Sequence, residues 1–522
     1  MPLPCRLLPF LLVALGGCAP GATTQTPAPQ PREAAPGWAV PATPPAAPIP
    51  REEYARRRQA VGATMDDGVL VVFGAAEPEN DYLPFAQSPA MRYLTGITEP
   101  GAALVMVKSG GAVQPHLFVL PRNPAREVWE GTRLGTGGAQ ALTGIPARPA
   151  DRLIPTLDSL LARHRTLYTL SPLAADANES EILRRDEQIV ARLAQRHPGT
   201  RVTPLDMQVL RVRASKSPAE LDLIRRAVHI TSLAHRAAMR SVEPGMNEFE
   251  IQGLVEYTFR RNGAERPAFA TIMGSGPNAT TLHYRSADRF MQAGEVMVMD
   301  IGASYRGYAA DVTRTVPVSG TFSPEQRAVY EIVLAAQKAA ESEARPGATL
   351  QELSETAARV IAGGLARLGL IESAGATYDC RGEGGSTGEC EQYQLFYMHG
   401  LGHGIGLDVH DPDVSYFGPF AVGSAFTIEP GIYVRADVLD HLPDTPRNRA
   451  LIARLRPTVE RYRDIGVRIE DDYFITPTGV ERVSGGAPRE IAEIEALMRE
   501  QGPGNLERHP EVVEWYRATT PR

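Results

Sequence analysis

Two aspartates in apolar surroundings mark the stretch of this chain best suited to chemistry. Asp300 lies in the run Glu295–Gly302, and Asp311 lies in the run Tyr308–Val316, with a glycine-containing turn between them. This pattern predicts a β-hairpin in which each carboxylate occupies a core position. Burying a charge there is costly unless it is neutralised, and two such charges on neighbouring strands repel each other. We therefore expect a cation between them; the alternative is that either aspartate merely ends or caps a strand.

Further carboxylates and histidines follow in similar settings. Glu429 lies in a strand-like run directly before a Pro-Gly pair, and Glu470 ends an alternating apolar strand. His399, His403 and His410 alternate with glycines, which let side chains approach one centre closely. Four carboxylates and one histidine form a hard ligand set that suits Mn²⁺, Co²⁺ or Fe²⁺, and Zn²⁺ less selectively. Because one ion cannot use so many carboxylates, the set predicts two divalent metal ions, Mn²⁺ by preference, and an activated water as nucleophile.

The composition limits the possible functions. The chain has 522 residues, more than one ordinary core, which predicts two domains with additional segments. Its hydrophobic content of 43% and charged content of 22% are typical of folded globular proteins. The net charge of -7 argues against a nucleic-acid partner, because nucleic-acid binding normally requires a basic face.

The first fifty residues are expected to lie outside the folded body. The apolar run 7–15 is too short to span a membrane, which takes roughly 18 residues. It is followed by Gly16, Gly17 and Cys18. This ending resembles the bacterial lipobox and implies a signal peptide over residues 1–17 and a lipid on Cys18. The alternative is an ordinary signal peptide cut at another small residue. Residues 18–50 are rich in proline and alanine and predict a semi-extended tether.

These segments together predict a location. We expect an extracytoplasmic bacterial lipoprotein that is anchored to a membrane through Cys18. The next residue is Ala19, not the aspartate that commonly retains lipoproteins in the inner membrane. This favours attachment to the outer membrane, facing the periplasm.

The first folded region has the pattern of an α/β domain over residues 51–212. Ser217 as a helix N-cap and Pro218 in the first helical turn mark the start of a second region. The first region has apolar runs of strand character at 69–73, 103–107, 116–120 and 166–170, and helical stretches at 51–65, 154–164 and 181–196.

The second region, residues 213–502, alternates pairs of helices with strands. This order predicts a loose internal duplication with helices outside a curved sheet, followed by a tail over residues 503–522. The helices are expected at 218–241, 247–262, 324–344, 349–369 and 488–501.

Seven short segments carry a resemblance to a known family. They are Met299–Gly302, Gly307–Thr315, His399–Asp411, Glu429–Tyr433 and Arg468–Asp472 in the second region, and Tyr93–Gly96 and Arg126–Gly131 in the first. From about Tyr54 to Met498 the chain resembles the Xaa-Pro aminopeptidases (aminopeptidase P) of the pita-bread metallopeptidases. The resemblance implies a creatinase-like α/β N-terminal domain followed by a pita-bread α+β catalytic domain with a curved antiparallel sheet. It also implies a homo-oligomer.

The resemblance assigns metal ligands by position. Asp311 and Glu470 would bridge two ions, Asp300 would hold one of them, and His403 with Glu429 would hold the other. Glu429 would also move the proton of the attacking water. Peptides with proline at the second position are the implied substrates.

The resemblance also assigns substrate contacts. His283 and His410 would lie near the scissile carbonyl and donate hydrogen bonds to the developing oxyanion. His399, Tyr433 and Arg468 would surround the proline ring and the carbonyl beyond it. For the three histidines a supporting or packing role is the alternative.

Three other functions compete with the Xaa-Pro aminopeptidase. A prolidase restricted to Xaa-Pro dipeptides would use the same chemistry. A metal-free creatinase-like hydrolase is disfavoured because that branch lacks the ligand set present here. A scaffold that only binds peptides is disfavoured because all five ligand types are retained.

The chain departs from the compact family pattern in three places, of which the first is the tether with its lipobox. Residues 436–461 are charged and predict a small helical excursion near the cleft. Residues 379–391 form an insertion that contains Cys380 and Cys390. In an oxidising compartment we expect these two thiols to form a disulfide, the alternative being two free buried thiols.

Overall fold

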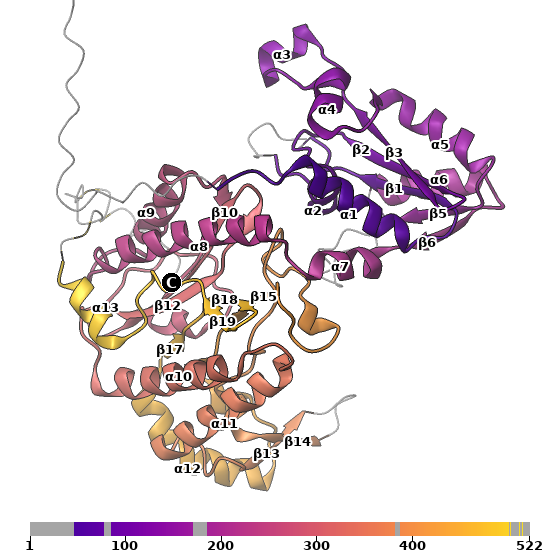
Figure 1. Ribbon diagram of the computed structural model, residues 1–522. Coiled ribbons are helices and arrows are strands. Elements are labelled where there is room, and N and C mark those ends of the chain that lie inside the picture. Colours follow the sequence, from indigo (N-terminus) through magenta and orange to yellow (C-terminus); the bar gives the residue numbers. More distant parts are fainter. Residues whose placement is uncertain are drawn as a thin grey trace, which may run out of the picture. The chain divides into compact units, whose positions relative to one another are not determined.

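The computed structural model describes residues 46–77, 85–170, 185–381 and 387–500, together with positions 502, 511 and 514. Residues 46–522 are grouped as one compact unit (Figure 1). The expected signal peptide and the lipid acceptor Cys18 lie outside the described residues, as does the tether up to residue 45. Within the described part of the chain, no helix has both the length and the apolar character that a membrane crossing needs.

The first region is built on a six-stranded mixed sheet. Its strands are β1 (Gly68–Phe73), β2 (Ala103–Ser109), β3 (Ala112–Val119), β4 (Ala147–Pro149), β5 (Thr166–Thr169) and β6 (Arg201–Pro204). They lie in the order β4-β3-β2-β1-β5-β6, with antiparallel pairs at the centre and parallel pairs on both sides. All four strands expected from apolar runs are confirmed as members of this sheet.

Helices cover both faces of this sheet. They are α1 (Arg51–Ala63), α2 (Pro89–Thr95), α4 (Gly135–Thr143), α5 (Leu153–Leu161) and α6 (Arg185–Arg196). Helix α3 (Pro124–Glu130) has no buried residue, and α7 (Asp206–Ala214) packs against α1. Because side chains alternate along a strand, Leu70 and Val72 of β1 face one core, and Val69 and Val71 face another. The second core is closed by the apolar residues of α5 and α6.

The second region begins with two long helices and repeats that order later. Its helices are α8 (Pro218–Met239), α9 (Glu248–Arg261), α10 (Pro324–Glu343), α11 (Leu350–Leu368), α12 (Pro446–Tyr462) and α13 (Ile491–Met498). The expected cap at Ser217 is confirmed as a capping box with Glu220, and Asn247, Ser323 and Thr349 start their helices in the same way. The last helix is shorter than expected.

The strands between these helices form several short sheets. They are β7 (Arg266–Pro267), β8 (Ile272–Ser275), β9 (Val296–Ile301), β10 (Ala303–Tyr305), β11 (Tyr308–Ala309), β12 (Val312–Pro317), β15 (Ala425–Ile428), β16 (Gly431–Val434), β17 (Ile465–Arg468), β18 (Asp471–Thr476) and β19 (Gly479–Arg482). The principal sheets have the orders β12-β9-β8, β15-β18-β19 and β16-β17, and their pairs are antiparallel. Helix α8 packs against β10–β12, and α10 packs against β15–β17 (Figure 1).

Two buried groups of charges lie at the junction of the first and second regions. Arg57 of α1 lies 3.2 Å from Glu220 of α8, and Glu220 also accepts a hydrogen bond from Tyr308 (3.1 Å). Asp411 is paired with Arg213 and, at 2.8 Å, with Lys216. Burial raises the pKa of Asp411, but these two cations outweigh it and hold the pKa below its usual value.

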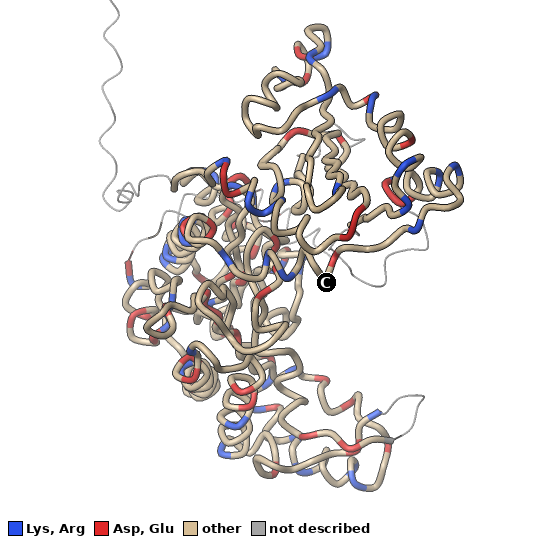
Figure 2. Tube along the Cα trace, turned by 45° about the vertical axis from the view of Figure 1, so that its right-hand side comes forward, with Lys and Arg blue, Asp and Glu red and all other residues tan. Residues whose placement is uncertain are grey.

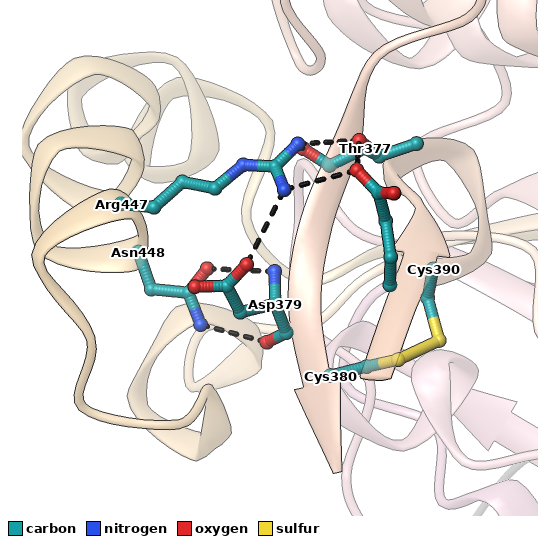
Figure 3. The surroundings of a disulfide bond; sticks show 7 residues. Thr377, Asp379, Cys380, Cys390, Arg447 and Asn448 are labelled. Atoms are coloured by element: carbon teal, nitrogen blue, oxygen red, sulfur yellow. Dashed lines mark hydrogen bonds and ion pairs between the residues drawn. A yellow bond between two sulfur atoms is a disulfide. The ribbon is translucent and has the colours of Figure 1, made fainter. Parts of the chain in front are cut away.

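The insertion around the two cysteines forms a disulfide-closed hairpin. Strands β13 (Thr377–Arg381) and β14 (Thr387–Glu391) pair with Tyr378 opposite Cys390. Cys380 and Cys390 are bonded, as expected from the sequence (Figure 3). Helix α12, in the predicted helical excursion, holds the hairpin because Asn448 donates to Asp379 O (2.8 Å) and Arg447 donates to Thr377 O (2.9 Å).

We predict that opening this disulfide destabilises the protein. Its ten-residue sequence separation corresponds to about 2–3 kcal/mol in the loop-entropy account. Reduction should add two hydrogens to the intact mass and lower the melting temperature of the native protein. The double variant Cys380→Ser/Cys390→Ser should melt lower as well and be insensitive to reductant. An unchanged mass on reduction would show that the thiols are free.

Candidate functional site

The aspartate hairpin forms as expected and places both carboxylates in the interior. Strands β9 and β12 are antiparallel, with Asp300 opposite Thr313, and Asp311 directly precedes β12. The side chains of Asp300 and Asp311 are both buried. Gly302 is required between them, because a Cβ there would lie 1.8 Å from Ala310 O. The hairpin therefore brings two negative charges into one core.

Glu429 and Glu470 lie at breaks between strands. The sequence predicted that Glu429 lies in a strand before the Pro-Gly pair and that Glu470 ends a strand. In the structure β15 ends at Ile428 and β17 ends at Arg468, so each glutamate lies just beyond a strand. At the second break the backbone N–H of Glu470 bonds to Thr313 O of β12 (3.1 Å) and does not continue the β16–β17 ladder. This crossing turns Glu470 toward the aspartate hairpin.

The histidine segment runs alongside β15. Thr427 N donates to His403 O (2.8 Å), and His403 N donates to Thr427 Oγ1 (3.1 Å). A Cβ at Gly402 would lie 2.1 Å from Thr427 O, so only glycine allows this close approach. The glycines beside His403 therefore allow the close approach that the sequence predicted.

Four of the predicted ligands converge on one point. Suitable ligand atoms of Asp311, His403 and Glu470 all lie within 4.8 Å of one another. His403 Nε2 is 3.5 Å from Asp311 Oδ2, 3.5 Å from Glu429 Oε1 and 3.9 Å from Glu470 Oε1. The fifth predicted ligand, Asp300, is oriented by Arg468, whose Nη2 donates to Asp300 Oδ2 (2.6 Å).

The electrostatics of this group favour a bound cation. Burial first, and neighbouring carboxylates second, raise the pKa of Asp311 and Glu429 well above their usual values. The same causes raise the pKa of Glu470 to about 7. Burial and His410 lower the pKa of His403 to about 4, so this imidazole is neutral and able to act as a ligand.

Unpaired oxygen atoms agree with a metal site. Asp300 Oδ1 and Asp311 Oδ1 are buried and have no hydrogen-bond partner among the described residues. Such atoms are costly to bury unless something binds them. Four carboxylates and a neutral imidazole are the donors that divalent first-row metals accept. The residues present therefore fit a divalent-metal site.

The predicted substrate-contact residues lie around this cluster. Tyr433 Oη is 2.9 Å from His399 Nε2 and accepts from Arg468 Nη1 at 2.9 Å. The ring of His410 lies 4.2 Å from that of His403 and is exposed. His283 is also exposed, and the carbonyl of its neighbour Leu282 accepts from Arg468 Nη2 (3.4 Å).

Some supporting residues could not be singled out from the sequence. Thr313 Oγ1 donates to Glu470 Oε2 (2.7 Å), and Asp472 Oδ2 accepts from the backbone N–H of Asp311 (3.1 Å). Buried Glu248 accepts from Ser275 N (2.6 Å) and from Arg289 N (3.2 Å), which ties together both ends of the loop that carries His283. Threonine in a strand and glutamate in a first helical turn are too common to signal such roles.

Comparisons with known proteins agree with this geometry. Residues 222–477 match the model of metallopeptidase family M24, and residues 54–168 match that of the aminopeptidase P N-terminal domain. The Xaa-Pro aminopeptidase of Escherichia coli is 34% identical over 469 residues, which cover 86% of this chain and 98% of the relative. The Xaa-Pro aminopeptidase of Haemophilus influenzae is 34% identical over 460 residues with the same coverage. The chain belongs to the Xaa-Pro aminopeptidase family.

Solved structures of the Xaa-Pro aminopeptidase family support the same assignment. Proline aminopeptidase P II from Yersinia pestis has a TM-score of 0.73 at 33% identity and covers 86% of this chain and 99% of its own. Aminopeptidase P from Escherichia coli with the inhibitor Pro-Leu has a TM-score of 0.71 at 33% identity, with coverages of 87% and 99%. The creatinase-like and pita-bread fold expected from the sequence is thereby confirmed.

We predict that metal binding at this site releases protons. In the metal-free protein the raised pKa values keep part of the carboxylate cluster protonated near pH 7, and a cation must displace these protons. Calorimetric titration of the metal-free protein with Mn²⁺, in buffers of different ionisation enthalpy, should show release of about one proton or more per chain at pH 7. The affinity should rise with pH.

The same shifts set the pH dependence of the metal-free protein's stability. Because the folded state holds the carboxylate protons more tightly than the unfolded state, the contribution of these carboxylates to the free energy of unfolding should fall as pH rises from about 5 to 7. The lowered pKa values of His399 and His403 act in the opposite direction, so the carboxylate contribution is measured as the difference from Asp311→Asn. Saturating metal should remove this trend. Proton uptake on metal binding would contradict the assignment of the raised pKa values.

Proposed function

We propose that the chain hydrolyses the first peptide bond of peptides whose second residue is proline. The main support is the convergence of Asp311, His403, Glu429 and Glu470 in a chain that aligns with nearly the whole length of named Xaa-Pro aminopeptidases. A metal-dependent aminopeptidase follows from the family. The roles of individual residues, the metal and the location are proposals.

The metal ligands are proposed from the donor set. Asp300, Asp311, His403, Glu429 and Glu470 would hold two divalent ions, with Asp311 and Glu470 facing both. Oxygen-rich donors with a single imidazole favour Mn²⁺. When bound, such ions supply Lewis acidity and lower the pKa of a water molecule toward neutrality.

Glu429 is the proposed proton carrier. Its carboxylate lies between His403 and His399, with Oε1 3.5 Å from the former and Oε2 3.8 Å from the latter. Burial and neighbouring carboxylates raise its pKa, so it can accept a proton from the attacking water near neutral pH. It would then deliver that proton to the departing proline nitrogen. His283 and His410, both exposed beside the cluster, would donate hydrogen bonds to the oxyanion.

His399, Tyr433 and Arg468 form the proposed wall for proline. Burial and Arg468 lower the pKa of His399 to about 4, so its ring is neutral. Tyr397 meets this ring edge-on at 5.1 Å and helps fix its orientation. The nitrogen of an Xaa-Pro bond carries no N–H, and the ring fixes φ. A site that offers rigid rings and requires no N–H from this nitrogen suits proline.

Substrate length separates this proposal from a prolidase. An Xaa-Pro aminopeptidase releases the first residue of an Xaa-Pro-Xaa tripeptide, whereas a strict dipeptidase leaves the tripeptide intact. A peptide panel that varies length and second residue, assayed with Mn²⁺, therefore tests the function directly. Cleavage of dipeptides alone would favour the prolidase.

We predict that the bridging carboxylates are needed for turnover and not for folding. Asp311→Asn or Glu470→Gln should lower turnover of an Xaa-Pro-Xaa tripeptide by several orders of magnitude, because a neutral amide cannot balance the ions' charge. The metal-free variants should melt at or above the temperature of the metal-free native protein, since carboxylate repulsion is relieved.

Asp379→Asn provides a control in which a carboxylate is structural. Asp379 accepts from Thr445 Oγ1 (2.6 Å) in the disulfide-closed hairpin. This variant should lose stability with and without Mn²⁺ and keep its turnover per folded molecule. If Asp311→Asn behaves like this control, Asp311 is structural and the proposed bridge is wrong.

We further propose that the chain is a membrane-anchored bacterial lipoprotein that faces the periplasm. The support is the lipobox-like segment that ends at Cys18. Palmitate labelling should depend on Cys18, and Cys18→Ala should release soluble protein with normal peptidase activity. Cys5→Ala is the matched control and should leave labelling unchanged. Membrane association that persists in Cys18→Ala would refute the anchor.

A further inference from the structure

A hollow lies on the surface of the first region, on residues that take no part in the carboxylate cluster. It is open to solvent, has a volume of about 800 Å³ and is lined by residues of β2, β3, β4 and α5 and their flanking turns. Ligand sites commonly enclose roughly 300–1,000 Å³. The size of this hollow is therefore that of a small-molecule site.

One wall of the hollow is a stripe on and beside α5. Arg152, Thr156, Ser159 and Arg163 all line it and recur at helical spacing. The opposite wall is Gln114 and His116 of β3, with Arg148 of β4 beside them. These residues face the same side of the sheet as Phe118, whose side chain closes the apolar core under α5.

The hollow is basic and has no acidic lining residue. Lysines, arginines and carboxylates recur along the whole trace in Figure 2, and the chain's net charge is -7. Here three arginines and two histidines line one hollow with no Asp or Glu. The single carboxylate of α5, Asp158, is turned to α6 and pairs with Arg196 at 3.0 Å.

The arginines of this hollow form few ion pairs. Among the described residues, Arg148 and Arg163 make no ion pair. Arg152 makes one, at 4.0 Å to Asp151, and both side chains are mostly exposed (69% and 76%). Such an exposed pair contributes little. The positive charge of the hollow is therefore largely uncompensated.

His116 adds a neutral donor to the arginines. Its Nδ1 is buried and has no hydrogen-bond partner among the described residues. We assign the proton of the neutral ring to Nε2, because an unpaired buried acceptor is less costly than an unpaired N–H. Burial, and then Arg148, lower the pKa of this imidazole, which keeps it neutral.

We propose that this hollow binds a phosphate group, with Arg148, Arg152 and Arg163 as the charged contacts. Three guanidinium groups offer more N–H donors than the two oxygens of a carboxylate can accept, whereas a phosphate monoester carries more oxygens and about two negative charges. Thr156, Ser159 and His116 supply further donors. The phosphate can be free in solution or can belong to a lipid headgroup.

The test compares two double variants of the full chain. Both carry Cys18→Ser, so that no lipid anchor contributes to vesicle binding. Arg148→Ser/Arg163→Ser removes two cations from the hollow. Arg192→Ser/Arg201→Ser is the matched control, because both residues are exposed on the same region, do not line the hollow and change the net charge equally. Binding is measured to inorganic phosphate by calorimetry and to phosphatidic acid vesicles by co-sedimentation.

We expect the hollow variant to bind at least about tenfold more weakly than the control to one or both probes, a loss of about 1.4 kcal/mol. Loss with inorganic phosphate alone assigns a soluble phosphate, and loss with vesicles alone assigns a lipid headgroup. Equal binding by both variants, or no binding by the chain that carries Cys18→Ser alone, would overturn the proposal. Melting temperature and tripeptide turnover should be equal in both variants, so this test is independent of the proposed peptidase function.

Discussion

The architecture of the second region depends on one electrostatic constraint, namely that three buried carboxylates and the partly buried Glu429 lie close together. Asp300, Asp311, Glu429 and Glu470 come from two separate hairpin-like units, and each would be unfavourable in the interior alone. The fold brings them together because strand breaks at Glu429 and Glu470 turn both side chains toward the aspartate hairpin. A cation then satisfies all of them at once. Without one, protons must take its place, as the raised pKa values indicate.

A second buried charge group supports this arrangement from behind. Arg314 of β12 donates to Asp471 Oδ1 (2.6 Å) and to the backbone carbonyls of Glu470 and Pro488. Asp471 also accepts from Arg489 (3.0 Å) and Gln337 (3.0 Å). Burial raises the pKa of Asp471, but the surrounding arginines outweigh this effect and hold the pKa below its usual value. Asp471 and Asp472 have opposite pKa shifts. Three arginines lower the pKa of Asp471, whereas burial and the neighbouring carboxylates outweigh the single arginine, Arg314, that acts on Asp472.

Much of this could be predicted from residue types, because burying a carboxylate in an apolar run is costly and therefore informative. The hairpin and the convergence of His403 with the carboxylates agree with that rule, and the helix caps followed from the capping residues that precede each helix. The strand ends at Ile428 and Arg468 lie close to the predicted ones. The direction in which Glu470 turns could not be predicted, because it depends on the backbone bond from Glu470 N to Thr313 O of a distant strand. Nor could periodicity reveal Glu248 or Thr313, whose importance lies in contacts made across the fold. The proposed roles of His283 and His410 rest on the family resemblance.

The charges buried between the first and second regions limit how this protein can be divided. A cut at the boundary near residue 213 would separate Arg57 from Glu220, and a cut a few residues later would also remove Arg213 and Lys216 from Asp411. Each cut leaves a buried carboxylate without its cation, which is far more costly than losing an exposed pair. Asp411 adjoins His410, so the damage would reach the substrate side of the cluster. An exchange of the first region between relatives would therefore succeed only if both buried charge groups stay complete. Arg57 must keep Glu220, and Arg213 with Lys216 must keep Asp411.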